Sequence, residues 1–202
     1  MRKLAFAAVL LPCLGWSQTF FSFDDAPQYT SLPVSVTADG ITATLTGTGQ
    51  SFSIQAANVL GFTPQGFSGK CIYPNSIYAA DLIIDFSTNL SEFSIMFSPE
   101  EYGSDTSATM RAIGYLNGTM VGYHDNIAPV PGTWPTGTLT YSNYSQNFDR
   151  IVVHYQAPPV NGENWGPIFM ADNMTIRAVP EPATLATLLG GLAILRLRHK
   201  RA

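Results

Sequence analysis

Cysteine is scarce in this 202-residue sequence, with Cys13 and Cys71 as its two examples. Cys13 follows an apolar run, but Pro12 stands directly before it, where a lipoprotein cleavage site needs a small residue. If the segment that carries Cys13 is removed, Cys71 is left alone. A lone cysteine excludes an internal disulfide, so the fold depends on its apolar core and, at most, on a metal ion.

The N-terminus has the pattern of a secretory signal peptide. Arg2 and Lys3 precede an apolar stretch at residues 4–14, and the small residues Gly15 and Ser17 fit the minus-three and minus-one positions of a signal peptidase site. We therefore predict that residues 1–17 are a signal peptide, that signal peptidase cuts after Ser17, and that the chain is exported.

Clusters of lysine and arginine are lacking in the body, residues 18–178. Thirteen acidic residues stand there against four basic ones, a net charge of −9, whereas the whole chain has −4 because both ends are basic. Binding of phosphate backbones needs clustered Lys and Arg. The sequence therefore argues against nucleic acid as a partner.

The body also lacks any long helical period, and instead shows short alternating runs of Thr, Ser, Val, Ile, Phe and Tyr between turn residues. "VSVTADGITATLT" and "MRAIGYLNGTMVGYH" predict hairpins that turn at Asp39-Gly40 and Asn117-Gly118, because these dipeptides accept the positive φ of a type I′ turn. Further strands are expected at residues 51–56, 81–86, 92–97, 137–142, 149–155 and 168–177. About ten strands in one domain predict an all-β, two-sheet, jelly-roll-like sandwich.

The last residues, 179–202, differ in composition from the body. A Pro-Glu-Pro tripeptide precedes thirteen apolar residues, 183–195, and the chain then ends in four basic residues: Arg196, Arg198, Lys200 and Arg201. As a helix the apolar run is about 20 Å long, short of the roughly 30 Å hydrocarbon core. A weak membrane segment followed by positive charges is typical of a sorting signal, and the positive charges would keep the C-terminus in the cytoplasm. An ordinary tail anchor is the alternative.

This tail resembles the PEP-CTERM sorting signal of Gram-negative bacteria that secrete exopolysaccharide, with its three parts in the same order. In that family exosortase, a membrane-embedded enzyme similar to cysteine transpeptidases, reads the tripeptide. The resemblance implies that Pro180, Glu181 and Pro182 are the recognition element, that residues 183–195 are a transmembrane helix and that residues 196–201 retain the tail. It also implies an inner-membrane form before processing, and then a location at the cell surface or in the extracellular matrix.

Catalytic motifs are missing from the body. No G-x-S-x-G sequence occurs, and neither His124 nor His154 lies in a motif that marks a nucleophile. Glu100-Glu101 has no partner carboxylate that could be nominated for glycoside cleavage, and a solvated acidic loop is the favoured interpretation. The first functional hypothesis is a non-enzymatic surface or biofilm-matrix protein.

Aromatic residues gather on or beside the Pro-Gly segments: Tyr102, Tyr123, Trp134, Tyr141, Tyr144 and Trp165. Exposed rings stack on sugars, and such a site is similar to those of jelly-roll carbohydrate-binding modules. We select Trp134 and Trp165 as candidate platforms for exopolysaccharide, with core packing as the alternative for each ring. A weak carbohydrate-binding module is therefore the second hypothesis, and an extracellular glycan-active enzyme the third.

A structural calcium ion is the one cofactor that the sequence suggests. If the first and last strands pair antiparallel, the end of "TFFSF" lies near the start of "NMTIRA", which brings Asp24 and Asp25 close to Asp172 and Asn173. Carboxylates that converge without a counter-charge repel each other, and Ca²⁺ would bind them through hard oxygen ligands. Jelly-roll carbohydrate-binding domains carry calcium at a similar place, although turns also favour Asp and Asn for local reasons. Asp24, Asp25 and Asp172 are the predicted ligands.

Overall fold

The computed structural model describes residues 18–59, 61–100, 108–128, 135–157 and 168–179. All named elements in these ranges are strands: β1 Gln18–Phe21, β2 Val34–Ala38, β3 Ile41–Gly47, β4 Phe52–Ala56, β5 Lys70–Pro74, β6 Leu82–Pro99, β7 Thr109–Leu116, β8 Thr119–Ile127, β9 Gly137–Ser142, β10 Phe148–Ala157 and β11 Phe169–Ala178. The predicted all-β class is confirmed. Within these ranges no helix is long and apolar enough to cross a membrane. The predicted signal peptide and the tail from residue 180 onward lie outside the described residues.

Both hairpins predicted from turn dipeptides are present. Asp39 and Gly40 have φ values of 50° and 77°, and Asn117 and Gly118 have 49° and 79°. These dihedrals lie in the left-handed region that type I′ turns require, which Asn, Asp and Gly tolerate best. The turns connect β2 to β3 and β7 to β8 in antiparallel register.

β6 corrects the sequence prediction of separate strands at 81–86 and 92–97, because Leu82–Pro99 is one 18-residue strand that contains all of these residues except Asp81. Its first part pairs with β3 and β10, and its second part pairs with β9 and β11. The intervening residues 87–91 contain no Gly or Pro, and register shifts opposite them bend the ladder instead of ending it. A strand that changes sheets in this way forms the corner of a sandwich.

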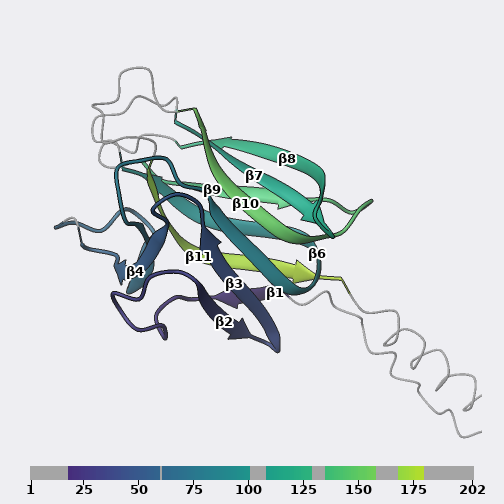
Figure 1. Ribbon diagram of the computed structural model, residues 1–202, viewed down its shortest axis with the longest axis horizontal. Helices are drawn as coiled ribbons and strands as arrows, with labels where there is room; N and C mark the ends of the chain where they lie inside the picture. Colours follow the sequence, from purple (N-terminus) through teal and green to yellow (C-terminus); the bar gives the residue numbers. More distant parts are fainter. Residues whose placement is uncertain (1–17, 60, 101–107, 129–134, 158–167, 180–202) are drawn as a thin grey trace, which may run out of the picture.

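The strands form two layers joined through β6 (Figure 1). Sheet I has the order β2-β3-β6-β10-β7-β8 and contains the first part of β6. Sheet II has the order β4-β5-β11-β6-β9, with β1 also paired to β11. β5 was not predicted, because its five residues, KCIYP, include a lysine and a proline and show no clear alternation.

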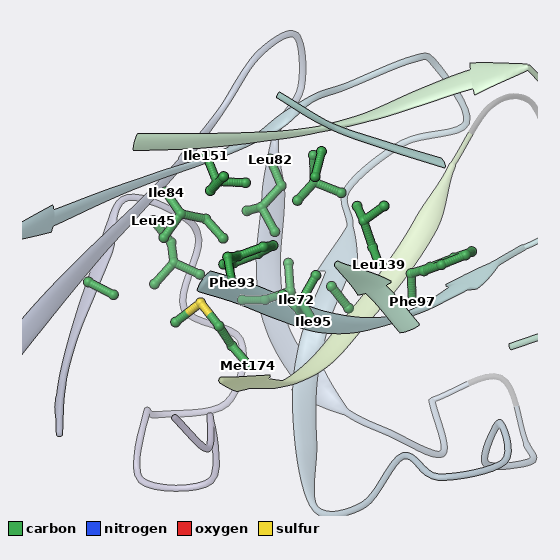
Figure 2. Close-up of a cluster of buried hydrophobic side chains, with 14 of the residues drawn as sticks. Leu45, Ile72, Leu82, Ile84, Phe93, Ile95, Phe97, Leu139, Ile151 and Met174 are labelled. Carbon is green, nitrogen blue, oxygen red and sulfur yellow. The ribbon is translucent and has the colours of Figure 1, made fainter. Parts of the chain in front are cut away.

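The core lies between the two sheets (Figure 2). Leu45, Ile84 and Ile151 of sheet I pack in the same buried cluster as Phe93 and Ile95 of sheet II. A smaller apolar cluster lies on the outer side of sheet II and consists of Ala57, Phe67, Cys71 and Met170. The outer face of sheet II is therefore covered, and Cys71 is a buried free thiol there.

Candidate functional site

The outer face of sheet I carries an ordered set of ionisable side chains that point away from the core. They form three pairs: Arg111 with Asp125, Arg150 with Asp85, and His154 with Asp81. The shortest N–O distances in these pairs are 2.7, 2.5 and 2.7 Å. All six side chains are partly accessible to solvent, so the face is open and each of these three acids lies beside a basic side chain.

Tyr123 is the exposed aromatic side chain of this face. The Arg111 guanidinium carbon lies 4.1 Å from the centroid of the Tyr123 ring. Arg111 in turn donates two hydrogen bonds to Asp125, from Nε at 2.7 Å and from Nη2 at 2.8 Å. These hydrogen bonds hold the pKa of Asp125 below its usual value, so the acid remains ionised and keeps Arg111 in place. The ring is thus positioned on one side by a cation, while Tyr123 remains 55% exposed.

A β-bulge brings this trio together. The Asn117-Gly118 turn pairs Leu116 with Thr119, and uninterrupted register would place Arg111 opposite His124. The register shifts by one residue at Gly122, whose φ is 153°, so Arg111 faces Asp125 instead. A bulge of this kind re-aims the side chains that follow it.

An apolar stripe crosses the same face between the charged pairs. Ile83, Val152, Ile113 and Tyr123 are successive partners on β6, β10, β7 and β8. The three aliphatic side chains are half-buried. Strands lie about 4.8 Å apart, so the stripe is about 15 Å long. Asp85 and Arg150 flank it on one side, and the pairs made by Asp81 and Asp125 flank it on the other.

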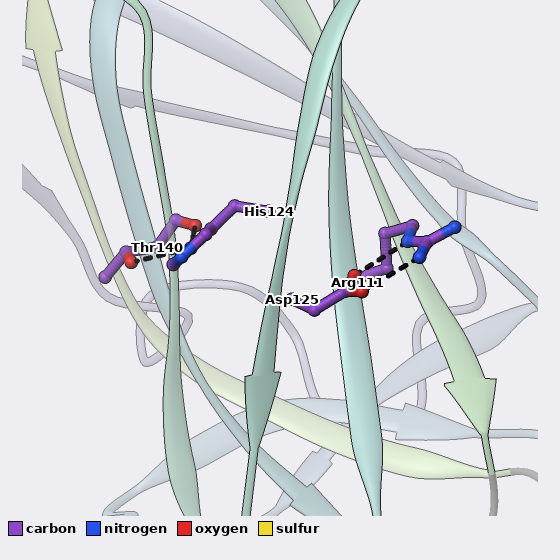
Figure 3. Close-up of polar contacts among 4 residues, drawn as sticks. All are labelled: Arg111, His124, Asp125 and Thr140. Atoms are coloured by element: carbon purple, nitrogen blue, oxygen red, sulfur yellow. Dashed lines mark hydrogen bonds and ion pairs between the residues drawn. The ribbon is translucent and has the colours of Figure 1, made fainter.

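Opposite faces of β8 have different roles (Figure 3). Asp125 points to Arg111 on the outer face, whereas the neighbouring His124 points to β9, where its Nδ1 lies 2.9 Å from the carbonyl oxygen of Thr140. The Thr140 N–H donates to the side-chain oxygen of Asn126. Side chains of β8 thus satisfy the backbone of β9, which assigns His124 a structural contact between the sheets.

His154 lies beside an acidic side chain on the outer face of sheet I. Its Nδ1 is hydrogen-bonded to Asp81 Oδ1, and in the described ranges no serine or cysteine is hydrogen-bonded to the ring.

The structure assigns the predicted aromatic residues to different environments. Trp134, Trp165 and Tyr102 lie outside the described residues. Tyr141 is buried and its ring packs edge-on against Phe148, so it belongs to the core. Tyr144 is exposed, and its hydroxyl donates to Glu92.

Glu100 corrects the interpretation of a solvated acidic loop, because it is only 5% exposed. Its N–H donates to the carbonyl of Ile168, which continues the β6–β11 ladder by one residue. Burial raises the pKa of Glu100 to about 7, although a hydrogen bond with the Tyr73 side chain works in the opposite direction. Its Oε1 has no hydrogen-bond partner among the described residues. Glu101 lies outside those residues.

The strand pairing behind the predicted calcium site is present, since β1 pairs antiparallel with β11 and Phe21 faces Met174. Asp172 is buried and accepts the N–H groups of Ser68 and Asn173 at 3.1 and 2.7 Å. Burial and, to a lesser degree, the charge of Asp24 raise the pKa of Asp172 to about 6.

The three predicted ligands do not form one cluster. Asp24 accepts the N–H of Lys70 at 2.7 Å, while Asp25 is exposed and makes no hydrogen bond within the described ranges. In the same part of the chain, no group of three or more His, Cys, Asp or Glu residues could hold a metal ion. Asp172 and Asp24 instead accept backbone N–H groups of one segment, from Ser68 and Lys70 respectively.

Comparisons with known proteins concern the architecture alone. No protein-family model matches the chain, and no curated protein matches it. Among solved structures, the K2 cleaved adhesin domain of Lys-gingipain is 9% identical, with a TM-score of 0.48 over 79% of this chain and 99% of that domain. The K1 cleaved adhesin domain from Porphyromonas gingivalis W83 is 14% identical, with a TM-score of 0.43 over 81% and 99%. A variant of a family 29 carbohydrate-binding module is 9% identical, with a TM-score of 0.38 over 82% and 99%. Such TM-scores support no conclusion about ligands.

Proposed function

We propose that the protein is a non-enzymatic, exported surface or matrix protein whose body binds polysaccharide weakly on the outer face of sheet I. The observation that carries the proposal is the exposed Tyr123 ring, which Arg111 and Asp125 hold at the end of an apolar stripe. Sugars present an apolar ring face and a rim of hydroxyl groups. A positioned aromatic ring can stack on the apolar face of the sugar, and neighbouring Asp, Arg and His side chains can form hydrogen bonds with its hydroxyl groups.

The expected affinity is low. One stacked ring contributes about 1–3 kcal/mol, on the scale measured for bases stacked on aromatic side chains. A few net hydrogen bonds add about 1 kcal/mol each. Together they reach roughly millimolar dissociation constants. Useful retention on a polysaccharide would then depend on many copies at one surface.

Titration with polysaccharide tests the proposal. Laminarin serves as a neutral glycan and alginate as an acidic one, and wild type is compared with Tyr123→Ala. We expect the variant to lose binding roughly tenfold or more, in line with the loss of one stacking contact. Tyr144→Ala is the matched control, because Tyr144 is an exposed tyrosine bonded to Glu92 of sheet II.

Three outcomes would contradict the proposal. Equal binding by wild type and Tyr123→Ala, or no binding to any glycan, would exclude the sheet I face as a carbohydrate site. Release of reducing ends from either polysaccharide by the wild-type protein would overturn the non-enzymatic assignment.

Export and sorting form the second part of the proposal, and the order of tripeptide, apolar run and basic end supports it. Signal peptidase would remove residues 1–17, and exosortase would then process the inner-membrane form at Pro180, Glu181 and Pro182. Replacing the tripeptide by three alanines should leave unprocessed protein in the inner membrane. Mass spectrometry of the surface fraction decides between the models, because wild-type protein that still carries "LRLRHKRA" there would favour a simple tail anchor.

A further inference from the structure

The junction of β1, β5 and β11 contains a cation of its own, the ammonium group of Lys70. We propose that this group takes the place of a bound calcium ion at the junction, so that the fold there is independent of divalent metal. Lys70 already occupies main-chain oxygens there, and the nearby carboxylates already accept hydrogen bonds.

Lys70 binds main-chain oxygens of the segment that follows β1. Its Nζ donates to the carbonyl oxygens of Asp24 and Ala26, both at 2.7 Å. Its backbone N–H donates to Asp24 Oδ1, also at 2.7 Å. One residue at the start of β5 therefore holds the β1 exit segment through three hydrogen bonds. Hard oxygen ligands of this kind, carbonyls beside a carboxylate, are those that Ca²⁺ would otherwise take.

The carboxylates at this junction have partners other than a metal. Asp172 accepts two backbone N–H groups, from Ser68 and Asn173. Asn173 also donates from Nδ2 to the carbonyl of Gly66 at 2.9 Å, which fixes the same segment. Calcium takes six to eight oxygen ligands at about 2.3–2.6 Å. Asp24 and Asp172 already accept backbone N–H groups of this segment, so these two carboxylates do not provide that shell.

Close packing at Gly69 reinforces this conclusion. Gly69 has a φ of 59°, and a Cβ added there would clash with Asp24 Oδ1. The backbone thus passes directly against the carboxylate that a shared cation would need. The Lys70 ammonium, a compact positive charge with three donors, binds the carbonyl oxygens of Asp24 and Ala26 beside these acids.

Thermal unfolding of the full chain tests the inference, with Lys70→Met and Lys70→Arg compared with wild type in calcium chloride and in EDTA. Wild type should melt at the same temperature in both solutions, since a ligand that does not bind cannot stabilise the folded state. Lys70→Met keeps much of the apolar stem but removes the charge and the donors, and should lower the midpoint by roughly 5 to 10 °C. Lys70→Arg retains the charge and should lose less.

Two results would overturn the inference. The first is a calcium-dependent rise in the wild-type midpoint that Asp172→Asn removes, because a metal would then bind at this junction. The second is a Lys70→Met midpoint equal to that of wild type. Should Lys70→Met fail to fold, the calcium and EDTA curves of the wild type and of Asp172→Asn still decide between lysine and metal.

Discussion

Three acids on the outer face of sheet I differ in their surroundings from two buried acids of sheet II, although sheet II also has one ion pair, between Arg177 and Glu92. On sheet I, Asp81, Asp85 and Asp125 are partly exposed, and each is paired with a basic side chain. On the sheet II side, Glu100 and Asp172 are buried, and no basic side chain bonds to either carboxylate within the described residues. Burial raises the pKa of both acids, whereas Arg111 lowers the pKa of Asp125.

This difference separates a surface that can receive a ligand from one that is already covered. Ala57 and Phe67 lie on the outer face of sheet II, where they pack with Cys71 and Met170. Gly66 contacts Met96 so closely that an added Cβ would clash with its side chain. No equivalent cover lies over the Tyr123 face in the described part of the chain, and Tyr123 remains exposed. The covered contacts of sheet II stabilise the fold, whereas the proposed binding uses the outer face of sheet I.

The largest effect is expected from disturbing the cover of sheet II. Gly69→Ala places a Cβ against Asp24 Oδ1 and also strains a positive φ, whereas Gly40→Ala strains a positive φ in open space. The strain alone costs about 1–2 kcal/mol, and the clash should bring the Gly69→Ala loss to about 3 kcal/mol or more. Chemical denaturation of both variants measures the difference. Equal losses would show that segment 68–70 is not held against Asp24.

An unusual pH dependence should follow from the buried acids. The pKa of Glu100 is raised to about 7 from an ordinary value of 4.5, so the folded state binds this proton more tightly than the unfolded state does. Its contribution to stability is complete below about pH 4.5 and is lost as the pH rises through 7. The loss is on the order of 3 kcal/mol at most. Asp172, with its pKa raised to about 6, contributes with the same sign.

Denaturation at pH 5 and at pH 8 checks this prediction. Wild type should be more stable at pH 5, and Glu100→Gln, which is neutral at both values, should reduce the difference. Asp39→Asn in the exposed β2–β3 turn is the control and should leave it unchanged. A wild-type protein that is more stable at pH 8 would contradict the assignment of Glu100 to a buried site.

Only a small effect on stability is expected from the ion pair of sheet I. Arg111 and Asp125 are partly exposed, and pairs of this kind contribute about 0.2–1 kcal/mol. A double-mutant cycle with Arg111→Ala and Asp125→Ala should give a coupling energy in that range. Either single variant should also weaken glycan binding, because the Tyr123 ring loses its support. Unchanged glycan affinity in both variants would remove their role in positioning the ring.

Local signals explain what the sequence could predict. The turns at Asp39-Gly40 and Asn117-Gly118 follow from the backbone preferences of four residues. The antiparallel pairing of β1 with β11 brings Asp24 close enough to Asp172 to raise its pKa, as expected. The calcium hypothesis assumed that these acids lacked a counter-charge. That hypothesis stays a prediction. It did not consider Lys70, whose ammonium binds two carbonyl oxygens near Asp24, because Lys70 opens β5, a strand without a clear alternating pattern.

The remaining features depend on contacts between distant segments. The continuity of β6 requires β3 and β10 beside one half and β9 and β11 beside the other, and no local pattern encodes that change of partners. Burial of Glu100 requires Tyr73 from β5 next to it. The hairpin register suggests a cross-strand partner for Arg111, but counting residues back from the turn without a bulge gives His124. The bulge at Gly122 shifts the register by one residue, so the partner of Arg111 is Asp125.

Ligands are proposed to reach the outer face of sheet I and not that of sheet II. An NMR titration of the isotopically labelled protein with laminarin tests this proposal most directly, because each backbone amide reports on its own surroundings. We expect shifts concentrated on Arg111, Ile113, Tyr123 and Val152, and none for Cys71 or Met170, which pack with Ala57 and Phe67. Shifts confined to the sheet II residues, with those of β7, β8 and β10 unchanged, would contradict it.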